Sequence, residues 1–359
     1  MTAPRTMRSA YMNWAKLHSH AAFNLATSGV ANLPRTALPI TLDDIELNGP
    51  SRYGYEPLQE ALAEKSGVTK ECVVRADGTS MANFLAMAAL IEPGDEVLIE
   101  QPAYELITST AEYLGASVRR FPRRFGIDPD VVERNLTPQT KLVILTNLHN
   151  PSGVYADDET LRQVGELAKR VGARVLVDEV YLDAAFDQPR LSAFHLGPHF
   201  VTTTSLTKVY GLSGLRCGWI LAEPSLADRM WRLNDLFASI PAHCAEKLSV
   251  VALNNLDGIL AHVKPLLATN HTLVNWFLDT RDDLDCVRPK YGTVFFPRLR
   301  NGSVEEFCQL LREKYDTKVV PGSFFEMPDH FRIGLGGDSE ILKQGLERIG
   351  HALDDFRKR

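Results

Sequence analysis

The strongest constraint on the fold is a series of seven short β-rich runs, several of them separated by amphipathic stretches. Helical patterns at 81–91 and 158–172 are two of these stretches. Strands that alternate with helices predict a largely parallel sheet with helices on both faces. Ligands of such sheets bind at the carboxyl ends of the strands, so we look for a site directly after each run. The runs lie at residues 72–77, 95–101, 116–121, 141–146, 173–180, 199–205 and 217–222.

The pattern changes after about residue 224, where a long helical region begins. A smaller α+β unit follows, and the first 40 or so residues are irregular and punctuated by proline. A chain of 359 residues exceeds the usual size of one hydrophobic core. We therefore expect an N-terminal arm (1–40) packing on the small domain, a large domain (41–250) and a small C-terminal domain (251–359). In the small unit we expect helices near 260–281, 303–315 and 338–357, and strands at 285–290, 293–299, 318–322 and 330–335.

The composition is that of an ordinary globular enzyme, with 45% apolar and 23% charged residues. A net charge of −6 argues against nucleic acid or an anionic membrane as the main partner. The five cysteines are scattered and form no C-x-x-C pair, which argues against disulfides and a zinc site and favours a reducing compartment. No run approaches the length of a membrane span, and the N-terminus has no signal-peptide core. We expect a cytoplasmic protein without a metal ion.

The stretch "TTTSLTKVYGLSGLRCGW" (202–219) places Lys208 in a Ser/Thr-rich turn after a predicted strand. Ser205 offers a hydroxyl nearby, and Arg216 could hold a phosphate as a fork donor. Neighbouring positive charge and partial burial lower the pKa of a lysine and make its amine nucleophilic. These features together favour a lysine that forms a Schiff base with a phosphate-bearing aldehyde cofactor, over a surface lysine in a flexible loop.

Two more polar residues follow predicted strands. Asp178 closes "ARVLVDEVY", and a buried carboxylate there needs a partner. It could pair with a cationic ring nitrogen, or it could only cap the next turn. Asn150 lies in the turn "LHNPSGVY", where its amide could donate to a ligand oxygen or simply belong to an ordinary turn.

The stretch "ADGTSMANF" reads as a strand end followed by a helix start. Gly78, Thr79 and Ser80 would present backbone N–H groups there, which is the simplest form of a phosphate site. An ordinary N-cap by Thr79 or Ser80 is the alternative.

The motifs "DGTS", "HNPSG", "VDEVY", "SLTKVYGLSGLRCGW" and "HFRIGL" occur in the order and spacing of fold-type I pyridoxal-phosphate enzymes. Over roughly residues 25–357 the chain resembles a class I/II aminotransferase. The resemblance implies an α/β fold: a large domain with a mostly parallel seven-stranded sheet between helices, and a small α+β domain. It also implies pyridoxal 5'-phosphate as the cofactor. The motif "DGTS" lacks the paired glycine common in close relatives.

The resemblance also implies roles for single residues. Lys208 would be the Schiff-base lysine and proton shuttle, and Asp178 would keep the pyridine nitrogen protonated so that the ring acts as an electron sink. Asn150 and Tyr181 would hydrogen-bond the phenolic oxygen of the ring. The phosphate would be held by Gly78, Thr79, Ser80, Ser205 and Arg216.

Four further residues match positions of the family. Tyr104 would stack on the ring, although a core tyrosine at a strand end is the alternative. Tyr53 would reach the phosphate of the neighbouring subunit, which implies a homodimer with shared sites. Arg332 would clamp the substrate α-carboxylate, together with Asn150. Gly29 falls where the N-terminal segment of the family closes over the substrate.

The expected activity is amino transfer between an L-amino acid and a 2-oxo acid. The stretch at 237–247 offers no second arginine for a dicarboxylate, so we expect a neutral or apolar side chain. Tyr11, Trp14 and Phe23 could form an apolar wall for it, or could only pack the arm. The same cofactor residues would also serve a lyase, a cyclase or a decarboxylase. A sensor module of a transcription regulator is disfavoured, because it would carry an added DNA-binding domain.

Overall fold

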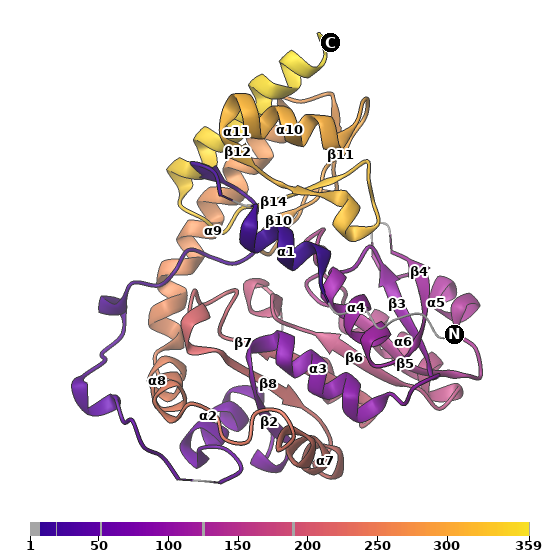
Figure 1. Cartoon of the computed structure of the whole chain (residues 1–359), viewed down its shortest axis with the longest axis vertical. Helices are drawn as coiled ribbons and strands as arrows, with labels where there is room; N and C mark the ends of the chain where they lie inside the picture. Colours follow the sequence, from indigo (N-terminus) through magenta and orange to yellow (C-terminus); the bar gives the residue numbers. More distant parts are fainter. Residues whose placement is uncertain (1–7, 19, 51, 124–125, 189–190, 359) are drawn as a thin grey trace.

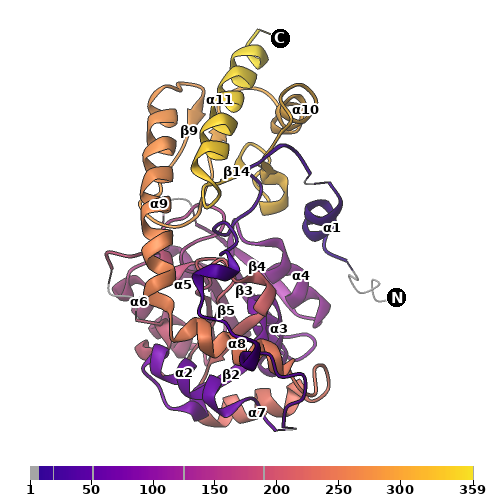
Figure 2. The ribbon, with the colours of Figure 1, turned by 90° about the vertical axis from the view of Figure 1, so that its left-hand side faces the viewer.

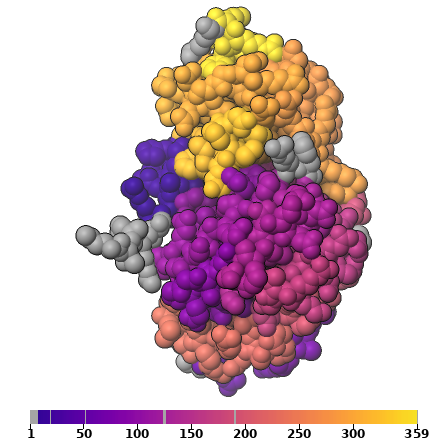
Figure 3. Space-filling view, turned by 90° about the vertical axis from the view of Figure 1, so that its right-hand side faces the viewer, coloured from indigo at the N-terminus to yellow at the C-terminus, as the bar shows by residue number. Residues whose placement is uncertain are grey.

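The computed structural model describes residues 8–18, 20–50, 52–123, 126–188 and 191–358. A small lobe formed by the C-terminal part of the chain lies on a larger lobe (Figure 3). All seven predicted runs are strands of one sheet in the large lobe, in the order β2-β8-β7-β6-β5-β3-β4. Their bounds are β2 (Val73–Asp77), β3 (Glu96–Gln101), β4 (Ser117–Pro122), β5 (Thr140–Thr146), β6 (Arg174–Asp178), β7 (Phe200–Ser205) and β8 (Cys217–Leu221).

Helices cover both faces of this sheet because its strands carry apolar residues on both sides. On β5, Leu142 and Ile144 pack in the cluster that holds α3 (Gly78–Leu90) and α7 (Pro224–Asn234). Val143 and Leu145 point the other way, into the cluster under α6 (Asp158–Arg170). A strand buried on both faces loses the polar alternation of a half-exposed strand, as the run "KLVILT" shows.

The sheet is mostly parallel, as predicted, with one reversed strand. β8 pairs antiparallel with β7 and with β2, whereas the other four pairs are parallel. The chain can therefore pass from β7 to β8 through a short loop at residues 206–216, at the carboxyl end of β7. The carboxyl ends of β2, β5 and β6 lie at the same edge of the sheet.

The long helical region expected after residue 224 is interrupted. α7 ends at Asn234, and α8 (His243–Leu253) begins only after an irregular stretch that contains Pro241. α9 (Leu256–Asp279) then runs from the large lobe into the small lobe (Figure 2). The small lobe holds a three-stranded sheet in the order β10-β14-β13. Among the described residues, no helix is both apolar and long enough to span a membrane.

The remaining elements are shorter. The other helices are α2 (Glu56–Ser66), α4 (Glu105–Tyr113), α5 (Pro129–Asn135), α10 (Val304–Tyr315) and α11 (Ser339–Phe356). The strands of the small lobe are β9 (Leu284–Asp285), β10 (Val294–Phe295), β11 (Arg298–Leu299), β12 (Thr317–Lys318), β13 (Val320–Pro321) and β14 (Phe331–Gly334).

The expectation that the first 40 residues are irregular was wrong in part. α1 (Ala10–Leu17) is a helix, and its start is capped by Ser9, whose Oγ accepts from Met12 N at 3.0 Å. Trp14 packs on Phe324 of the small lobe with ring centroids 5.4 Å apart. Eight residues are too few to form a stable isolated helix, so tertiary packing determines this one.

The next part of the arm lies along the small lobe, before the chain crosses to the large lobe (Figure 1). β1 (Phe23–Asn24) pairs in parallel with β12. Gly334 N then donates to Leu25 O at 2.7 Å, and Ala31 N donates to Gly336 O at 2.8 Å. Backbone hydrogen bonds, which a sequence pattern does not reveal, therefore help to hold this part of the arm.

We predict that Gly334→Ala loosens the arm. A Cβ at this position would lie 1.8 Å from Thr27 O, so the arm backbone has to shift. Overpacking of this kind costs about 1–3 kcal/mol. Urea denaturation should show this loss, whereas Gly258→Ala in α9, where a Cβ meets nothing within 4 Å, should not lower stability. Equal stability of Gly334→Ala and the wild-type protein would contradict the prediction.

Candidate active site

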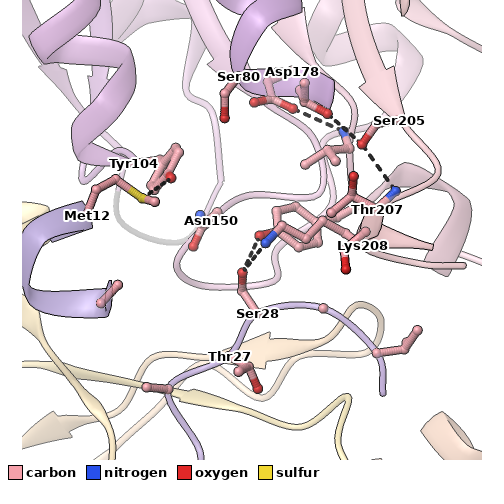
Figure 4. Close-up of a pocket in the computed structure, with 18 of the residues that line it drawn as sticks. Met12, Thr27, Ser28, Ser80, Tyr104, Asn150, Asp178, Ser205, Thr207 and Lys208 are labelled. Atoms are coloured by element: carbon pink, nitrogen blue, oxygen red, sulfur yellow. Dashed lines mark hydrogen bonds between the residues drawn. The ribbon is translucent and has the colours of Figure 1, made fainter. Parts of the chain in front are cut away.

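A pocket of about 540 Å³ opens at the carboxyl edge of the large sheet. One wall comes from the ends of the strands and the loops after them, and the other comes from the arm and α1 (Figure 4). Segments far apart in the sequence thus meet around one cavity, as the strand order requires.

Lys208 reaches this pocket from the loop between β7 and β8. Its Nζ donates to Ser28 Oγ at 3.1 Å. Burial, with smaller contributions from the charges of Arg332 and Arg216, lowers the pKa of the amine to about 8, and the charge of Asp178 opposes this shift. The amine therefore has an appreciable neutral fraction near neutral pH, as a nucleophile or a proton carrier requires.

Asp178 ends β6, and its carboxyl group is buried. Oδ2 accepts from Asn83 Nδ2 at 2.8 Å, and Oδ1 accepts from Val180 N at 3.1 Å. Asn83 is held in turn by Thr203, whose Oγ1 donates to Asn83 Oδ1 at 2.5 Å. Burial raises the pKa of Asp178 to about 6, although both hydrogen bonds and the charge of Lys208 oppose this. The bond from Val180 N shows that Asp178 does cap the following turn. Its carboxyl group also lines the pocket, where it can pair with a cationic group.

The start of α3 forms an anion cradle together with the loop after β7. Neither Thr79 nor Ser80 caps the helix, and Asp77 at the N-cap makes no side-chain cap bond. Thr79 Oγ1 donates to Ser205 Oγ at 2.8 Å. The hydroxyls of Thr79, Ser80 and Ser205 thus surround uncapped N–H groups at the positive end of a helix.

Arg216 completes this cradle. Its Nη2 donates to Asp77 O at 3.1 Å, and a Cβ on Gly78 would lie only 2.4 Å from that nitrogen. Glycine at 78, with φ of +73°, therefore lets the guanidinium approach the helix start. A guanidinium, uncapped N–H groups and hydroxyls fit a phosphate dianion.

Arg332 is fully buried behind the pocket wall on β14. Nη1 donates to Asn150 Oδ1 at 2.9 Å, and Nη2 donates to Tyr11 OH at 3.0 Å and Ala26 O at 2.9 Å. Its Nε has no hydrogen-bond partner among the described residues. Asn150, Tyr11 and Ala26 all line the pocket. A carboxylate that reaches the fork has to displace or share these partners.

Two tyrosines flank the cavity from the large lobe. Tyr181 is buried, its OH donates to Ser28 Oγ at 2.9 Å, and burial raises its pKa. Tyr104 donates to Met12 Sδ at 3.4 Å and meets the Tyr11 ring edge-on, with centroids 5.5 Å apart. Burial raises the pKa of Tyr104 well above its ordinary value, so both tyrosines are neutral phenols.

The structure brings most of the predicted site residues to this one pocket. It is lined by Gly29, Thr79, Ser80, Tyr104, Asn150, Asp178, Tyr181, Ser205, Lys208 and Arg216. Gly78 lies against Arg216, and Arg332 lies just behind the wall. Tyr53 is not among the lining residues; its OH donates to Asp235 at 2.9 Å on the surface.

Sequence reasoning missed four groups of the site. Asn83 carried a signal, because it follows Thr79 by four residues and so lies on the same face of α3. Thr207 adjoins the lysine but had not been singled out. Ser28 lies in the irregular arm, where no pattern points to it. Tyr11 had been considered only for its apolar ring, whereas its hydroxyl accepts from Arg332.

We predict that Asp178→Asn stabilises the ligand-free protein above pH 6. The folded-state pKa of Asp178 is about 6 and its unfolded value is about 4, so wild-type stability falls as pH rises through this range. Asparagine does not titrate, so the variant avoids a loss of roughly 3 kcal/mol. Urea denaturation between pH 4 and 8 should show the difference growing with pH. A difference independent of pH would contradict the burial argument.

A comparison with known proteins identifies the family of this chain. The model of the family "Aminotransferase class I and II" matches residues 35–349. Capreomycidine synthase of Streptomyces vinaceus is 30% identical over 351 residues, which cover 93% of this chain and 90% of that protein. A probable aspartate/prephenate aminotransferase of Thermus aquaticus is 28% identical, with 85% of this chain and 84% of that protein covered.

Solved structures agree in fold. A PLP-dependent aminotransferase from Streptococcus suis superposes with a TM-score of 0.91 at 25% identity, and 99% of each chain is covered. The PLP-dependent cyclase OrfR gives a TM-score of 0.89 at 26% identity, again over 99% of each chain. The lysine, the carboxyl group and the anion cradle fit pyridoxal phosphate, the cofactor of these enzymes. The chain belongs to the class I and II aminotransferase family.

Proposed function

We propose that the protein moves an amino group between an L-amino acid and a 2-oxo acid. The observation that carries this proposal is the buried amine of Lys208, whose pKa of about 8 suits proton transfer near neutral pH. When bound, pyridoxal phosphate supplies the electron sink that stabilises negative charge at the α-carbon. Lys208 then takes the α-proton and returns it, while Asp178 holds the ring nitrogen and the cradle around Arg216 holds the phosphate.

We further propose that the substrate has a neutral side chain. Apart from tyrosines, the ionisable residues that line the described pocket are Asp178, Lys208 and Arg216. All three have roles toward the cofactor in this proposal. The arm side of the pocket presents Met12, Trp14 and neutral polar groups, so a charged side chain would meet no opposite charge there.

A cyclase or lyase acting on the same amino-acid carbanion is the second candidate. It is favoured by the similarity to capreomycidine synthase and to the cyclase OrfR, which match this chain over nearly its whole length. A decarboxylase would use the same cofactor residues. Because these reactions diverge after the α-carbon is activated, the products decide between them.

We also propose a cytoplasmic homodimer whose partner covers the apolar surface near Tyr53. Leu42 and Leu47 are each 85% exposed, and Leu236 is 77% exposed. Tyr53 OH donates to Asp235, which adjoins Leu236 in the chain. We propose that these large exposed apolar residues belong to the interface, from which Tyr53 would extend to the neighbouring phosphate. We also propose the division into a large domain (41–250) and a small domain (251–359). Gly29 is proposed as a contact of the substrate.

The first prediction of the proposed function concerns the cofactor and the reaction. Addition of pyridoxal phosphate to the wild-type protein should give a visible absorbance band that Lys208→Ala lacks. In a panel of neutral amino acids, the right donor should abolish the band, and a 2-oxo acid should restore it. Steady release of ammonia or CO2 instead would support the second candidate. No band in the wild-type protein would contradict the proposed function.

The second prediction concerns Arg332. Arg332→Ala should raise the KM for the amino acid about 100-fold, because a charged two-point contact with the carboxylate is lost. Pyridoxal phosphate affinity, measured by fluorescence titration, should change far less. Arg332→Lys keeps the charge but loses the two-point contact. Its KM for the amino acid should therefore lie between the values of the wild-type protein and of Arg332→Ala. Equal loss of amino-acid and cofactor affinity would exclude the proposed role.

A further inference from the structure

Ser28 is a buried serine of the arm whose hydroxyl contacts the reactive amine. Its Oγ accepts from Lys208 Nζ at 3.1 Å and from Tyr181 OH at 2.9 Å (Figure 4). Only 7% of the residue is exposed. A serine 180 positions away in the sequence thus joins the two groups that stand beside the cofactor position.

The backbone on both sides holds Ser28 in this place. Thr293 Oγ1 donates to Ser28 O at 2.6 Å from the small lobe. Val30 N donates to Lys208 O at 2.8 Å, which ties the arm to the lysine loop itself. At Gly29, between these bonds, a Cβ would lie 3.2 Å from Lys208 O. The small residue at 29 allows the close approach that places the Ser28 hydroxyl against the amine.

A hydroxyl can serve both charge states of a lysine. It has one hydrogen and two lone pairs, whereas an ammonium group only donates and a neutral amine has one lone pair. Tyr181 donates to one lone pair of Ser28. The other accepts from charged Lys208, and rotation of the hydroxyl lets Ser28 donate to the neutral amine instead. A bond with a charged donor is the stronger of the two, so Ser28 favours the protonated form.

We propose that Ser28 is a further catalytic residue, which hydrogen-bonds Lys208 Nζ in both its charged and its neutral form while the amine moves a proton. This inference rests on the proposed function for what the amine does. The other charged or titratable groups that act on the amine are Asp178, which favours its charged form, and Arg332 and Arg216, which oppose it. Tyr181 donates to Ser28, and among the described residues it forms no hydrogen bond with the amine. Substitution of Ser28 leaves all four of these residues in the chain.

The test measures Lys208 in the protein without cofactor. Competitive acetylation with isotope-labelled acetic anhydride between pH 6 and 10, read by mass spectrometry of the peptide that contains Lys208, gives the pH midpoint of the amine. We expect Ser28→Ala to lower this midpoint by about one pH unit, because the charged form loses an acceptor. Ser28→Thr keeps the hydroxyl and should keep the midpoint.

Thr27→Val is the matched control, because Thr27 adjoins Ser28 in the arm and makes no described hydrogen bond to Lys208. It should leave the midpoint unchanged. A wild-type midpoint in folded Ser28→Ala, with folding checked by circular dichroism, would overturn the proposal, as would equal changes in Ser28→Ala and Thr27→Val. If Ser28→Ala does not fold, a midpoint in Ser28→Thr below the wild-type value would likewise overturn it.

A second readout uses the protein loaded with pyridoxal phosphate. Ser28→Ala should lower kcat about tenfold or more with little change in KM, since Ser28 assists the proton carrier and not the carboxylate clamp. Loss confined to KM would contradict the role. Failure of the proposed function is recognised separately, because a protein without a visible band still reports the Lys208 midpoint by acetylation.

Discussion

The burial of two opposite charges at one edge of the sheet is the constraint on which the site depends. Lys208 and Asp178 both line the pocket, and burial drives each toward its neutral form. Among the described residues the two groups form no hydrogen bond with each other: Asp178 accepts from Asn83 and Val180, and Lys208 donates to Ser28. Both groups therefore carry a desolvation cost in the folded protein. A ligand that pairs with both of them offsets this cost when it binds.

The sheet topology explains how those groups come together. Because β8 runs antiparallel to β7, the lysine loop turns back at the same edge where β6 ends with Asp178. The start of α3 after β2 lies there too, so the anion cradle and the lysine share one cavity. The arm and Arg332 on β14 close the cavity from the small lobe. A displacement of either lobe would separate Arg332 from the amine of Lys208.

The large sheet and the pocket residues at the ends of its strands could be predicted, because local sequence patterns indicate both. Buried strands read as short apolar runs, and Lys208, Asp178 and Asn150 each follow such a run. The arm could not be predicted in the same way. α1 is too short for its sequence pattern to predict a helix. β1 is a two-residue strand held by backbone bonds to the small lobe. The importance of Ser28 and of the Tyr11 hydroxyl follows from contacts with residues 180 and 321 positions away in the chain. A local sequence pattern does not reveal such contacts.

The arm therefore contributes more than a wall to the pocket. Tyr11 OH accepts from the guanidinium of Arg332, and Ser28 Oγ accepts from the amine of Lys208. One continuous segment thus bonds both buried cationic groups. These bonds satisfy the buried donors of Arg332 and Lys208, which would otherwise be costly. Because both bonds come from one segment, a shift of the arm would disturb the surroundings of Arg332 and Lys208 together.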